Sequence, residues 1–471
     1  MAKILFPSSS SPGVNRQEGG GRLINAYAEK LGPAGPASFV IRRAPGLRLF
    51  AGSGETGIRG QTFIDPYLYA AFSNRLVRFD SVGVGTAVGT LNGSDWVTFA
   101  RNNRTPTPDR VVVTEDAVYT FTDTSITELV DGDLPQPNSV CFIDGYFFYT
   151  IADGRCFASE INGTGISSND YIRAEAKPDG LLRGVAFARD LYLCGPSTIE
   201  VWSNTGNATG FPFSRTTVIW RGLAGRKAIA GFEDGFATAL LWVSDDNAVH
   251  QLSGYGTQKV SPPELDRLIE ATTDKDQLEA SVFVVGGHPC WRITGPNFTW
   301  VYDIGTQDWH ERHSYLDTRW RVAGNSVQAF GRWLTGDRLS GSVLEITEDT
   351  AREAGEPLVW EVVSGDMGDF PSRFTVPRAQ FYFVTGTGVA NGEDPIERQP
   401  QVAISWSDDG AVNWSTPVLR EIGPQQVTKT RVVVNRCGMT SVRGRRWRLA
   451  VADPVYVGLI GGDMQIQGRS G

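Results

Sequence analysis

Residues 146–161, YFFYTIADGRCFASEI, show the pattern that decides the fold. An aromatic run of strand-forming residues is followed by a polar turn, ADGR, and then by a second apolar run. Aromatic and β-branched residues favour strands, and Asp and Gly in a short turn let the second strand return beside the first. This stretch therefore predicts a β-hairpin.

Similar hairpins recur along the chain. They are predicted to start at Tyr67, Ala117, Tyr146, Leu191, Leu240, Pro289 and Arg332. The intervals between successive starts are 50, 29, 45, 49, 49 and 43 residues. A hairpin every ~40–50 residues is the spacing of β-propeller blades, which cover their faces by packing radially against one another. Six blades are favoured, on the interpretation that the 29-residue interval splits one blade; seven blades and an array of β-sandwiches are the alternatives.

The sequence predicts an all-β chain in three regions. Residues 1–46 are expected to form an extended N-terminal arm, because their Ser, Gly and Pro content favours a segment that orders only against a neighbouring molecule. Residues 47–355 form the propeller body, with a short helical insertion near 263–280, where a Pro precedes leucines at helical spacing. In residues 356–471 helix signals vanish and long strands dominate, which predicts a C-terminal β-sandwich-like domain.

Composition excludes several classes of protein. With 471 residues, of which 41% are hydrophobic, the chain can bury a large core and is not disordered throughout. Five cysteines without a CxxC pair argue against a disulfide framework or a structural zinc site. No stretch approaches the ~20 apolar residues of a membrane span, and the first residues lack a signal-peptide pattern. We therefore expect a protein that has no membrane contact and is made in a cytoplasm.

Charge is unevenly distributed. The net charge is −8, whereas a general nucleic-acid binder should be basic. Residues 371–471 hold 12 basic and 8 acidic residues, a balance of +4, so the remainder holds 32 and 44, a balance of −12. The C-terminal region is therefore expected to attract an acidic surface.

Residues 407–414, SDDGAVNW, resemble the Asp-box S-x-D-G-G-x-T-W, although Ala411 replaces the second Gly. We interpret the motif as a structural turn without a catalytic role. Asp409 would accept hydrogen bonds from turn amides, Gly410 would permit the bend and Trp414 would pack beneath it. Ser407 opens the motif.

The densest basic cluster comprises Arg443, Arg445, Arg446, Trp447 and Arg448. On a strand, alternate side chains of this cluster would point to opposite faces. Arg and Trp are both enriched at protein interfaces, so the cluster is a candidate interface. A solvated strand and a nucleic-acid contact are the alternatives.

Other motifs lack the context that their chemistry needs. Residues 52–57 match G-x-G-x-x-G, but the following residues alternate like a strand where a dinucleotide site needs a helix. His310 and His313 are spaced by three, unlike the zinc motif H-E-x-x-H, and no helix is expected there. Asp245 and Asp246 form an adjacent carboxylate pair typical of turns. We predict no catalytic, cofactor or metal site.

Two stretches resemble a known family. Residues 21–29 (GRLINAYAE), followed by 43–47 (RAPGL), are similar to the start of tail proteins of short-tailed bacteriophages. Residues 174–206 resemble a central segment of the tail accessory factor of lambdoid short-tailed phages, also called the packaged DNA stabilization protein. The matching core is Pro178, Asp179 and Gly180, then Ser197, Thr198, Ile199 and Glu200, and finally Thr205 and Gly206.

This resemblance implies a structural virion protein and no enzyme. Members of the family form a hexameric ring below the portal and adaptor rings, where they act as a tail nozzle or plug that retains packaged DNA and passes it on ejection. The implied partners are further copies of the chain, the tail adaptor, and the tail spike or fibre and tail needle proteins. DNA passes without sequence-specific binding, no cofactor is implied, and the location is the virion tail after assembly in the host cytoplasm.

Two rival hypotheses remain at this stage. The first is a virion-associated propeller glycosidase, in which Asp245 and Asp246 would belong to an acidic cleft. The second is a glycan- or receptor-binding module that forms no ring.

Overall fold

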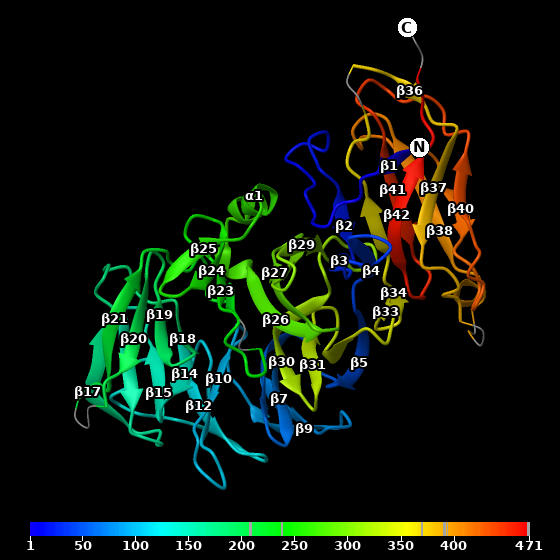
Figure 1. The fold of residues 1–471 in the computed structure, drawn as a ribbon. Helices are drawn as coiled ribbons and strands as arrows, with labels where there is room; N and C mark the ends of the chain where they lie inside the picture. The colour runs from blue at the N-terminus through cyan, green and yellow to red at the C-terminus, as the bar shows by residue number, and fades with distance from the viewer. Residues whose placement is uncertain (207–209, 237–238, 369–370, 390–391, 393, 469–471) are drawn as a thin grey trace.

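The structure is a computed structural model that describes residues 1–206, 210–236, 239–368, 371–389, 392 and 394–468. Helices in these residues are limited to α1 (Pro263–Ala271), α2 (Pro395–Arg398) and a 3-10 turn (Lys275–Gln277). Figure 1 shows a wide body of radially arranged sheets and a smaller body of stacked strands, and both ends of the chain lie at the smaller body. The fold is all-β.

The wide body is a β-propeller with seven four-stranded antiparallel blades in the described residues. Blades 1 to 4 contain β6 (Ile58–Ile64), β7 (Tyr67–Phe72), β8 (Arg75–Phe79), β9 (Gly85–Thr90); β10 (Thr98–Arg101), β11 (Arg110–Val113), β12 (Val118–Phe121), β13 (Ile126–Glu128); β14 (Ser139–Ile143), β15 (Tyr146–Thr150), β16 (Arg155–Ser159), β17 (Ile166–Arg173); and β18 (Arg183–Phe187), β19 (Asp190–Cys194), β20 (Ile199–Asn204), β21 (Phe213–Ile219). Blades 5 to 7 contain β22 (Ile229–Ala230), β23 (Leu241–Val243), β24 (Val249–Ser253), β25 (Gly256–Lys259); β26 (Glu279–Val285), β27 (His288–Thr294), β28 (Thr299–Asp303), β29 (Asp308–Glu311); and β30 (Val322–Ala329), β31 (Arg332–Asp337), β32 (Ser342–Thr347), β5 (Gly46–Gly52).

Blade 3 shows why these sequences form blades. Asp144 and Gly145 have φ angles of 51° and 94°, which close the two-residue turn between β14 and β15. On β15, Phe147 and Tyr149 pack toward blade 2, whereas Phe148 packs toward blade 4. Because both faces of the strand are buried, its sequence is continuously apolar. Full burial of each such side chain stabilises the fold by about 1.5–3 kcal/mol.

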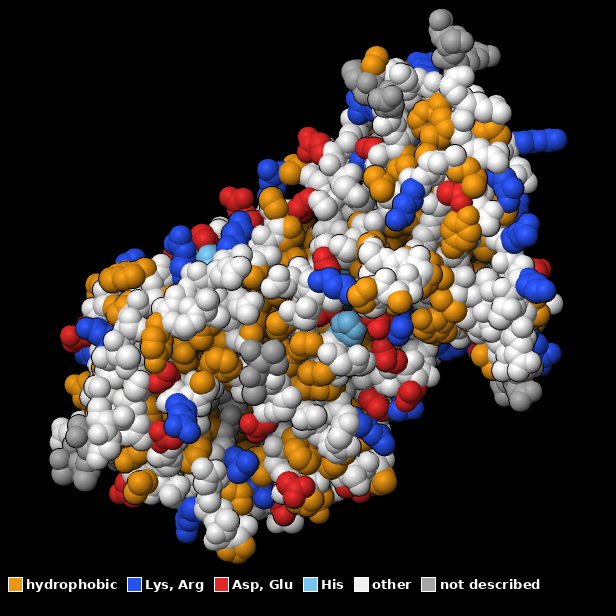
Figure 2. Space-filling view, viewed as in Figure 1, with side chains coloured by type: hydrophobic (Ala, Val, Ile, Leu, Met, Phe, Trp, Pro, Cys, Tyr) orange, Lys and Arg blue, Asp and Glu red, His pale blue; other side chains and the backbone are white. Residues whose placement is uncertain are grey.

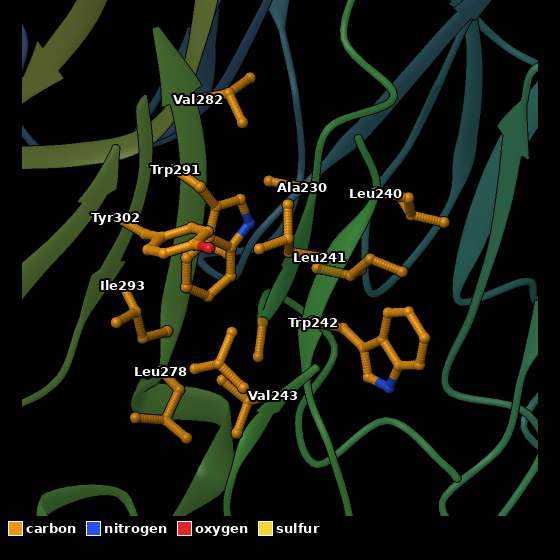
Figure 3. Close-up of a cluster of buried hydrophobic side chains, with 14 of the residues drawn as sticks. Ala230, Leu240, Leu241, Trp242, Val243, Leu278, Val282, Trp291, Ile293 and Tyr302 are labelled. Carbon is orange, nitrogen blue, oxygen red and sulfur yellow. The ribbon is translucent and has the colours of Figure 1, made fainter. Parts of the chain in front are cut away.

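The contact between blades 5 and 6 belongs to a large cluster of buried hydrophobic side chains. In Figure 3, Leu241 and Val243 on β23 approach Trp291 and Ile293 on β27. Trp242 points to the opposite side of β23. Alternate residues of one strand thus contribute to two inter-blade layers.

The favoured number of six blades needs correction to seven in the described residues. Each predicted hairpin belongs to a different blade, so the 29-residue interval splits none. The irregular spacing arose in blade 2. There, the hairpin starting at Ala117 covers β12 and β13, whereas the equivalent second and third strands are β11 and β12.

The last blade is completed from the other end of the propeller sequence. Strand β5 pairs antiparallel with β32, with Leu47 opposite Ile346 and Gly46 opposite Thr347. The same sheet continues into β33 (Arg352–Glu353) and β34 (Glu356–Pro357). Closure therefore joins residues almost 300 positions apart, and it covers the edge that β32 would otherwise expose.

The smaller body is a β-sandwich that includes N-terminal strands. One sheet contains β1 (Ala2–Ile4), β3 (Ala26–Lys30), β4 (Phe39–Arg43), β42 (Gly458–Met464), β37 (Arg378–Phe383) and β40 (Val432–Asn435). The facing strands are β2 (Arg22–Ile24), β35 (Trp360–Val363), β41 (Arg446–Val451), β38 (Gln401–Ser407) and β39 (Val418–Glu421). A short pair, β36 (Phe374–Thr375) and β43 (Gln467–Gly468), lies apart from both sheets.

The N-terminal segment differs from the expected arm that orders against a neighbour. Strand β1 pairs with β42, where Ala2 lies opposite Met464, and β4 pairs with the same edge of β42 farther along. Ile4, Leu23 and Ile41 lie in the sandwich core. The segment therefore pairs with its own chain, because short apolar strands between its Gly- and Ser-rich loops complete the sandwich.

Strand β2 joins the two bodies into one nine-stranded sheet. It runs parallel to β29 of blade 6, with Ile24 opposite Glu311, and antiparallel to β35 of the sandwich. Just after it, the Asn25 side chain donates hydrogen bonds to the carbonyl oxygens of His313 (3.0 Å) and Val359 (2.9 Å). Hydrogen bonds to both bodies thus fix their junction.

Candidate functional site

The Asp-box residues form a tight turn after β38. The Asp409 carboxylate accepts hydrogen bonds from the main-chain N–H groups of Asn413 (2.9 Å) and Val412 (3.1 Å). Ser407 Oγ donates to the same carboxylate (2.7 Å), and Gly410 has a φ of +78°. These bonds, chiefly that from the Asn413 amide, favour the ionised form and lower the pKa of Asp409 to about 2.

Trp414 links this turn to β41. Its half-buried ring lies beneath the Arg448 guanidinium, 4.6 Å from the ring centroid. Arg448 Nε also donates to Ser405 Oγ on β38 (3.2 Å). The arrangement stabilises the outer face of the sandwich and presents no chemistry for catalysis.

Most of the basic cluster lies inside the sandwich. The Arg445 side chain is 1% exposed and forms two hydrogen bonds to the Asp408 carboxylate (2.8 and 2.9 Å). Arg446 forms the equivalent pair with Asp366 (2.7 and 2.5 Å), and Trp447 is fully buried. These charges are neutralised within the chain.

The interface interpretation therefore needs correction for Arg445, Arg446 and Trp447, which are not accessible to a partner in this conformation. Arg443 is exposed, and its guanidinium donates to the side chain of Gln17 in the N-terminal segment. Sequence alone did not reveal the burial, because Asp408 and Asp366 are separated from the cluster by 37 and 80 residues.

A different basic surface lies at the open edge of the sandwich, where β39 and β40 end their sheets. We call it the basic edge and define it by Arg420, Lys429, Arg431 and Arg436. None of these residues forms an ion pair within the described part of the chain. In Figure 2, Lys and Arg side chains gather on the rim of the smaller body where Figure 1 places β40. No sequence motif marks this surface, because its members are scattered among neutral residues.

The propeller encloses a central cavity of about 390 Å³, which we call the channel. Its wall is built from the first strands of the blades: β6, β10, β14, β18, β22, β26 and β30. Asp234, in the segment that follows β22, also lines the cavity. Phe232 and Glu233 line the cavity, and Gly235 lies against Gln328 on β30.

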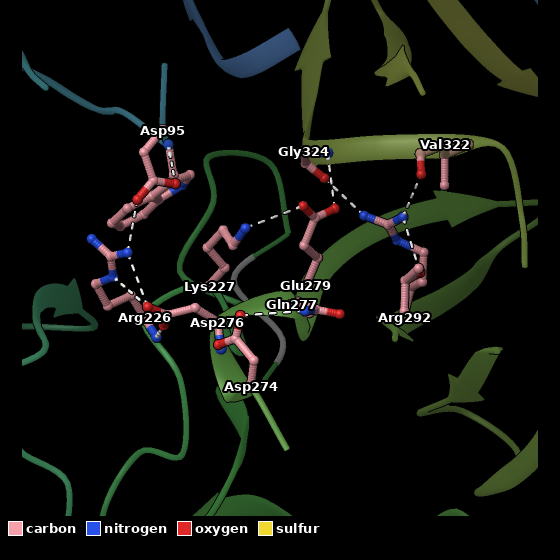
Figure 4. A network of polar contacts seen from close by, with 12 residues as sticks. Asp95, Arg226, Lys227, Asp274, Asp276, Gln277, Glu279, Arg292, Val322 and Gly324 are labelled. Carbon is pink, nitrogen blue, oxygen red and sulfur yellow. Dashed lines mark hydrogen bonds and ion pairs between the residues drawn. The ribbon is translucent and has the colours of Figure 1, made fainter. Parts of the chain in front are cut away.

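Fixed ion pairs surround one end of the channel (Figure 4). Arg226 Nη2 contacts the carboxylates of Asp95 (2.8 Å) and Asp276 (2.9 Å). Lys227 Nζ lies 3.5 Å from Glu279 Oε1 on β26. The contacts tie the loop before blade 2 to blades 5 and 6, so this end of the channel is held rigidly.

Arg183, at the start of β18, faces the channel between aromatic rings. Its guanidinium carbon lies 4.5 Å from the Trp96 ring centroid and 4.8 Å from that of Phe232. Nη1 donates a long hydrogen bond to the Arg226 carbonyl oxygen (3.4 Å), whereas the buried Nε has no acceptor in the described residues. Burial lowers the pKa of Arg183 to about 10, so the group remains charged at neutral pH.

The carboxylates of the glycosidase hypothesis lie outside the channel. Asp245 and Asp246 occupy the turn between β23 and β24, where Asp245 accepts a hydrogen bond from the Gly222 N–H (3.2 Å) and Asp246 contacts His250 (3.0 Å). Arg221 lies 3.5 Å from Asp246. No group of three or more His, Cys, Asp or Glu in the described residues could hold a metal ion.

Two family models match successive parts of the chain. The model described as bacteriophage P22 Gp10, beta-propeller, matches residues 23–351, and the model described as bacteriophage P22 Gp10, beta-sandwich, matches residues 371–467. The chain belongs to the bacteriophage P22 Gp10 family. The two matches agree with the two bodies of the fold. Membership of this phage family points to a structural protein of the virion without enzymatic activity.

Two solved structures match the chain at low similarity. The chain is similar to the WD40 beta propeller domain of Doa1, with a TM-score of 0.42 and 10% identity over 64% of this chain and 96% of that chain. It is also similar to a streptogramin B lyase structure, with a TM-score of 0.43 and 12% identity over the same shares, 64% and 96%. No curated protein matches the chain in sequence. None of the helices in the described residues has the length and apolar character needed to cross a membrane.

Proposed function

We propose that this member of the P22 Gp10 family is a tail nozzle or plug. Copies of the chain assemble into a ring, expected to be hexameric, below the portal and adaptor. The ring retains packaged DNA, carries other tail proteins and lets DNA pass at ejection. The observation that carries this proposal is the match of both bodies, residues 23–351 and 371–467, to phage P22 Gp10 models.

The size of the channel supports a DNA passage formed between copies. At about 390 Å³, the channel has the volume of a small-ligand site. Duplex DNA cannot enter such a space, since its major groove alone is about 12 Å wide. A passage for DNA therefore requires a ring in which each propeller is part of the wall.

Charge supports a contact between neighbouring copies. The basic edge carries four cations without internal ion pairs, whereas residues outside 371–471 have a balance of −12. Exposed Leu419 (57%) and Val427 (46%) flank these cations. Apolar side chains beside complementary charge are typical of protein interfaces. We assign the basic edge of one copy to the acidic propeller of the next.

The proposed ring also needs surfaces for other tail proteins. The tail adaptor, the tail spike or fibre and the tail needle are the proposed partners, and propeller loops are suited to these contacts because a rigid scaffold positions them. DNA would pass through the ring without sequence readout. An acidic wall would not bind the DNA tightly, because it repels phosphate.

Electron microscopy of the chain mixed with its portal–adaptor complex tests the proposal. We expect a ring of copies docked on the adaptor face, and no such ring on the portal alone. A chain that stays at about 51 kDa and never docks would overturn the nozzle function and favour a glycan- or receptor-binding module. Assembly has to be examined on the partner complex, because oligomers can form only when a template shifts the equilibrium.

A further inference from the structure

The channel contains a cation that the chain itself leaves without a counter-ion. Arg183 forms no ion pair among the described residues, and its Nη2 has no hydrogen-bond acceptor there. The neighbouring cations differ: Arg226 is neutralised by two carboxylates and Lys227 by one. Among the described residues, the channel cations without an ion pair are Arg183 and the exposed Arg101, and of these two Arg183 is the one held between aromatic rings.

The aromatic contacts determine how Arg183 can bind a ligand. Trp96 and Phe232 pack against the guanidinium at 4.5 and 4.8 Å and restrict its rotation. Arg183 lines the cavity, and its free N–H edge is the part of the group that remains for hydrogen bonding. A guanidinium group whose orientation is fixed in this way can donate hydrogen bonds to the oxygens of a phosphate or carboxylate group.

A neighbouring carboxyl group tunes the charge of the channel. Glu233 accepts a hydrogen bond from the Gly231 N–H (2.6 Å), and its half-buried position raises its pKa to about 7. Arg183 favours the ionised form but does not offset the loss of hydration. Near neutral pH, a large share of Glu233 is therefore uncharged and can donate a hydrogen bond to an anion.

We propose that the propeller channel binds a small oxyanion, a phosphate or carboxylate group of a small molecule, with Arg183 as its anchor. The cavity of about 390 Å³ accommodates such a ligand but no macromolecule. Protonated Glu233 supplies a second hydrogen bond. The site is independent of ring formation, because every residue that lines it belongs to one propeller.

Calorimetric titration of the purified chain at constant ionic strength tests this site. Inorganic phosphate represents the phosphate source and acetate the carboxylate source, and saturable one-site binding of either probe is expected. Arg183→Gln should weaken binding about tenfold to hundredfold, since a charged hydrogen-bond donor is lost. Arg189→Gln is the matched control, because Arg189 is exposed in the turn that follows β18. No saturable binding, or equal binding by Arg183→Gln, overturns the proposal.

The pH dependence provides a second, independent readout. Sulfate is used as the probe because its charge is constant from about pH 6 to about pH 8, the range in which Glu233 loses its proton. Wild-type binding should weaken as the pH rises, whereas Glu233→Gln should bind almost equally throughout. Arg101, Lys227, Asp234 and Glu279 also line the channel, and Lys227 and Glu279 neutralise each other. A pH profile of Glu233→Gln identical to that of wild type overturns the role of Glu233. If Arg183→Gln does not fold, Arg183→Lys, which keeps the charge, replaces it in the titration.

Discussion

Arg312 and Glu353 form an ion pair from which solvent is excluded on both sides. Each side chain is 0% exposed, and the closest nitrogen–oxygen distance is 3.3 Å. Glu353 also accepts hydrogen bonds from Trp320 Nε1 and Ser314 Oγ (both 2.7 Å). Burial opposes ionisation, raising the pKa of Glu353 and lowering that of Arg312. Removal of either charge would leave the other one buried without its counter-ion, which destabilises the fold.

Glu353→Gln should therefore leave a buried guanidinium without its counter-ion. We expect the free energy of unfolding to fall by about 3–5 kcal/mol, measured by urea denaturation. Glu356→Gln, an exposed change three residues later, should alter it by less than about 0.5 kcal/mol. Equal effects of the two substitutions would show that the buried charge is not what destabilises the variant.

Because the imidazole of His310 is buried, we predict that the protein loses stability in mild acid. Burial, followed by the charge of Arg312, lowers the pKa of His310 from its ordinary 6.5 to about 3. Below about pH 6.5, His310 therefore binds a proton in the unfolded chain but not in the native chain. The free energy of unfolding consequently declines as the pH falls from neutral toward 3. His288 opposes this trend, because its hydrogen bond to Asp303 raises its pKa.

Comparing His310→Asn with wild type isolates this contribution. The variant should lose less stability than wild type between about pH 7 and about pH 5 in urea melts, since Asn binds no proton. Carboxylates contribute equally to both proteins, so the difference between the two profiles reports His310. Parallel profiles would contradict the predicted proton uptake.

At the scale of single elements, β5 determines whether the propeller closes. A Cβ atom on Gly46 would lie 2.3 Å from the Thr350 carbonyl oxygen and 2.5 Å from that of Arg352. At the other end of the strand, a Cβ atom on Gly52 would meet nothing within 4 Å. One strand thus offers a crowded glycine and an open one.

Gly46→Ala should destabilise the propeller by at least about 1–3 kcal/mol, because main-chain oxygens have to move. Gly52→Ala is the matched control and should change the free energy of unfolding by less than about 0.5 kcal/mol. Thermal unfolding followed by circular dichroism measures both. If Gly46→Ala has the same melting temperature as the control, the crowding around Gly46 does not determine the stability of the closed propeller.

Blade sequences were predictable because each hairpin pattern is local. Phe147, Phe148 and Tyr149 form a continuous apolar run that both faces of a blade require. Pairings over long sequence separations were not predictable. The contact of β1 with β42 spans more than 450 residues, and Ile4 has no local pattern that indicates its partner.

The candidate site was predicted only in part for the same reason. The Asp409 turn is a local motif, so its geometry could be described from eight residues. Burial of Arg445 depends on Asp408 and on the packing of two sheets, which composition does not report. Arg183 carries no sequence signal, since its environment is assembled from loops of blades 2 and 5.

At the scale of the whole molecule, the proposed contact between copies depends on charge. Arg431→Glu with Arg436→Glu reverses the basic edge without touching a described ion pair. Assembly on the portal–adaptor complex should weaken about tenfold or more, and wild-type assembly should weaken with rising salt. Sedimentation at two ionic strengths measures both effects.

Arg173→Glu with Arg189→Glu is the control for this charge reversal. It makes the same change in net charge at two exposed propeller residues that form no described ion pair. Assembly of this variant should match wild type. If both double variants assemble normally, the ring remains and the assignment of the basic edge is wrong.

The order of strand pairing has a consequence for biosynthesis. Strand β1 pairs only with β42, near residue 460, among the described strands. The hairpin of β3 and β4 joins its sheet through the same strand, and β5 pairs with β32. The propeller can close only after β32 has been made, and the sandwich only after β42 has been made, although the middle blades can form early. A prematurely terminated product would expose unpaired strands to proteolysis. Chains that lack the C-terminal strands would therefore be degraded before they could be assembled into a particle.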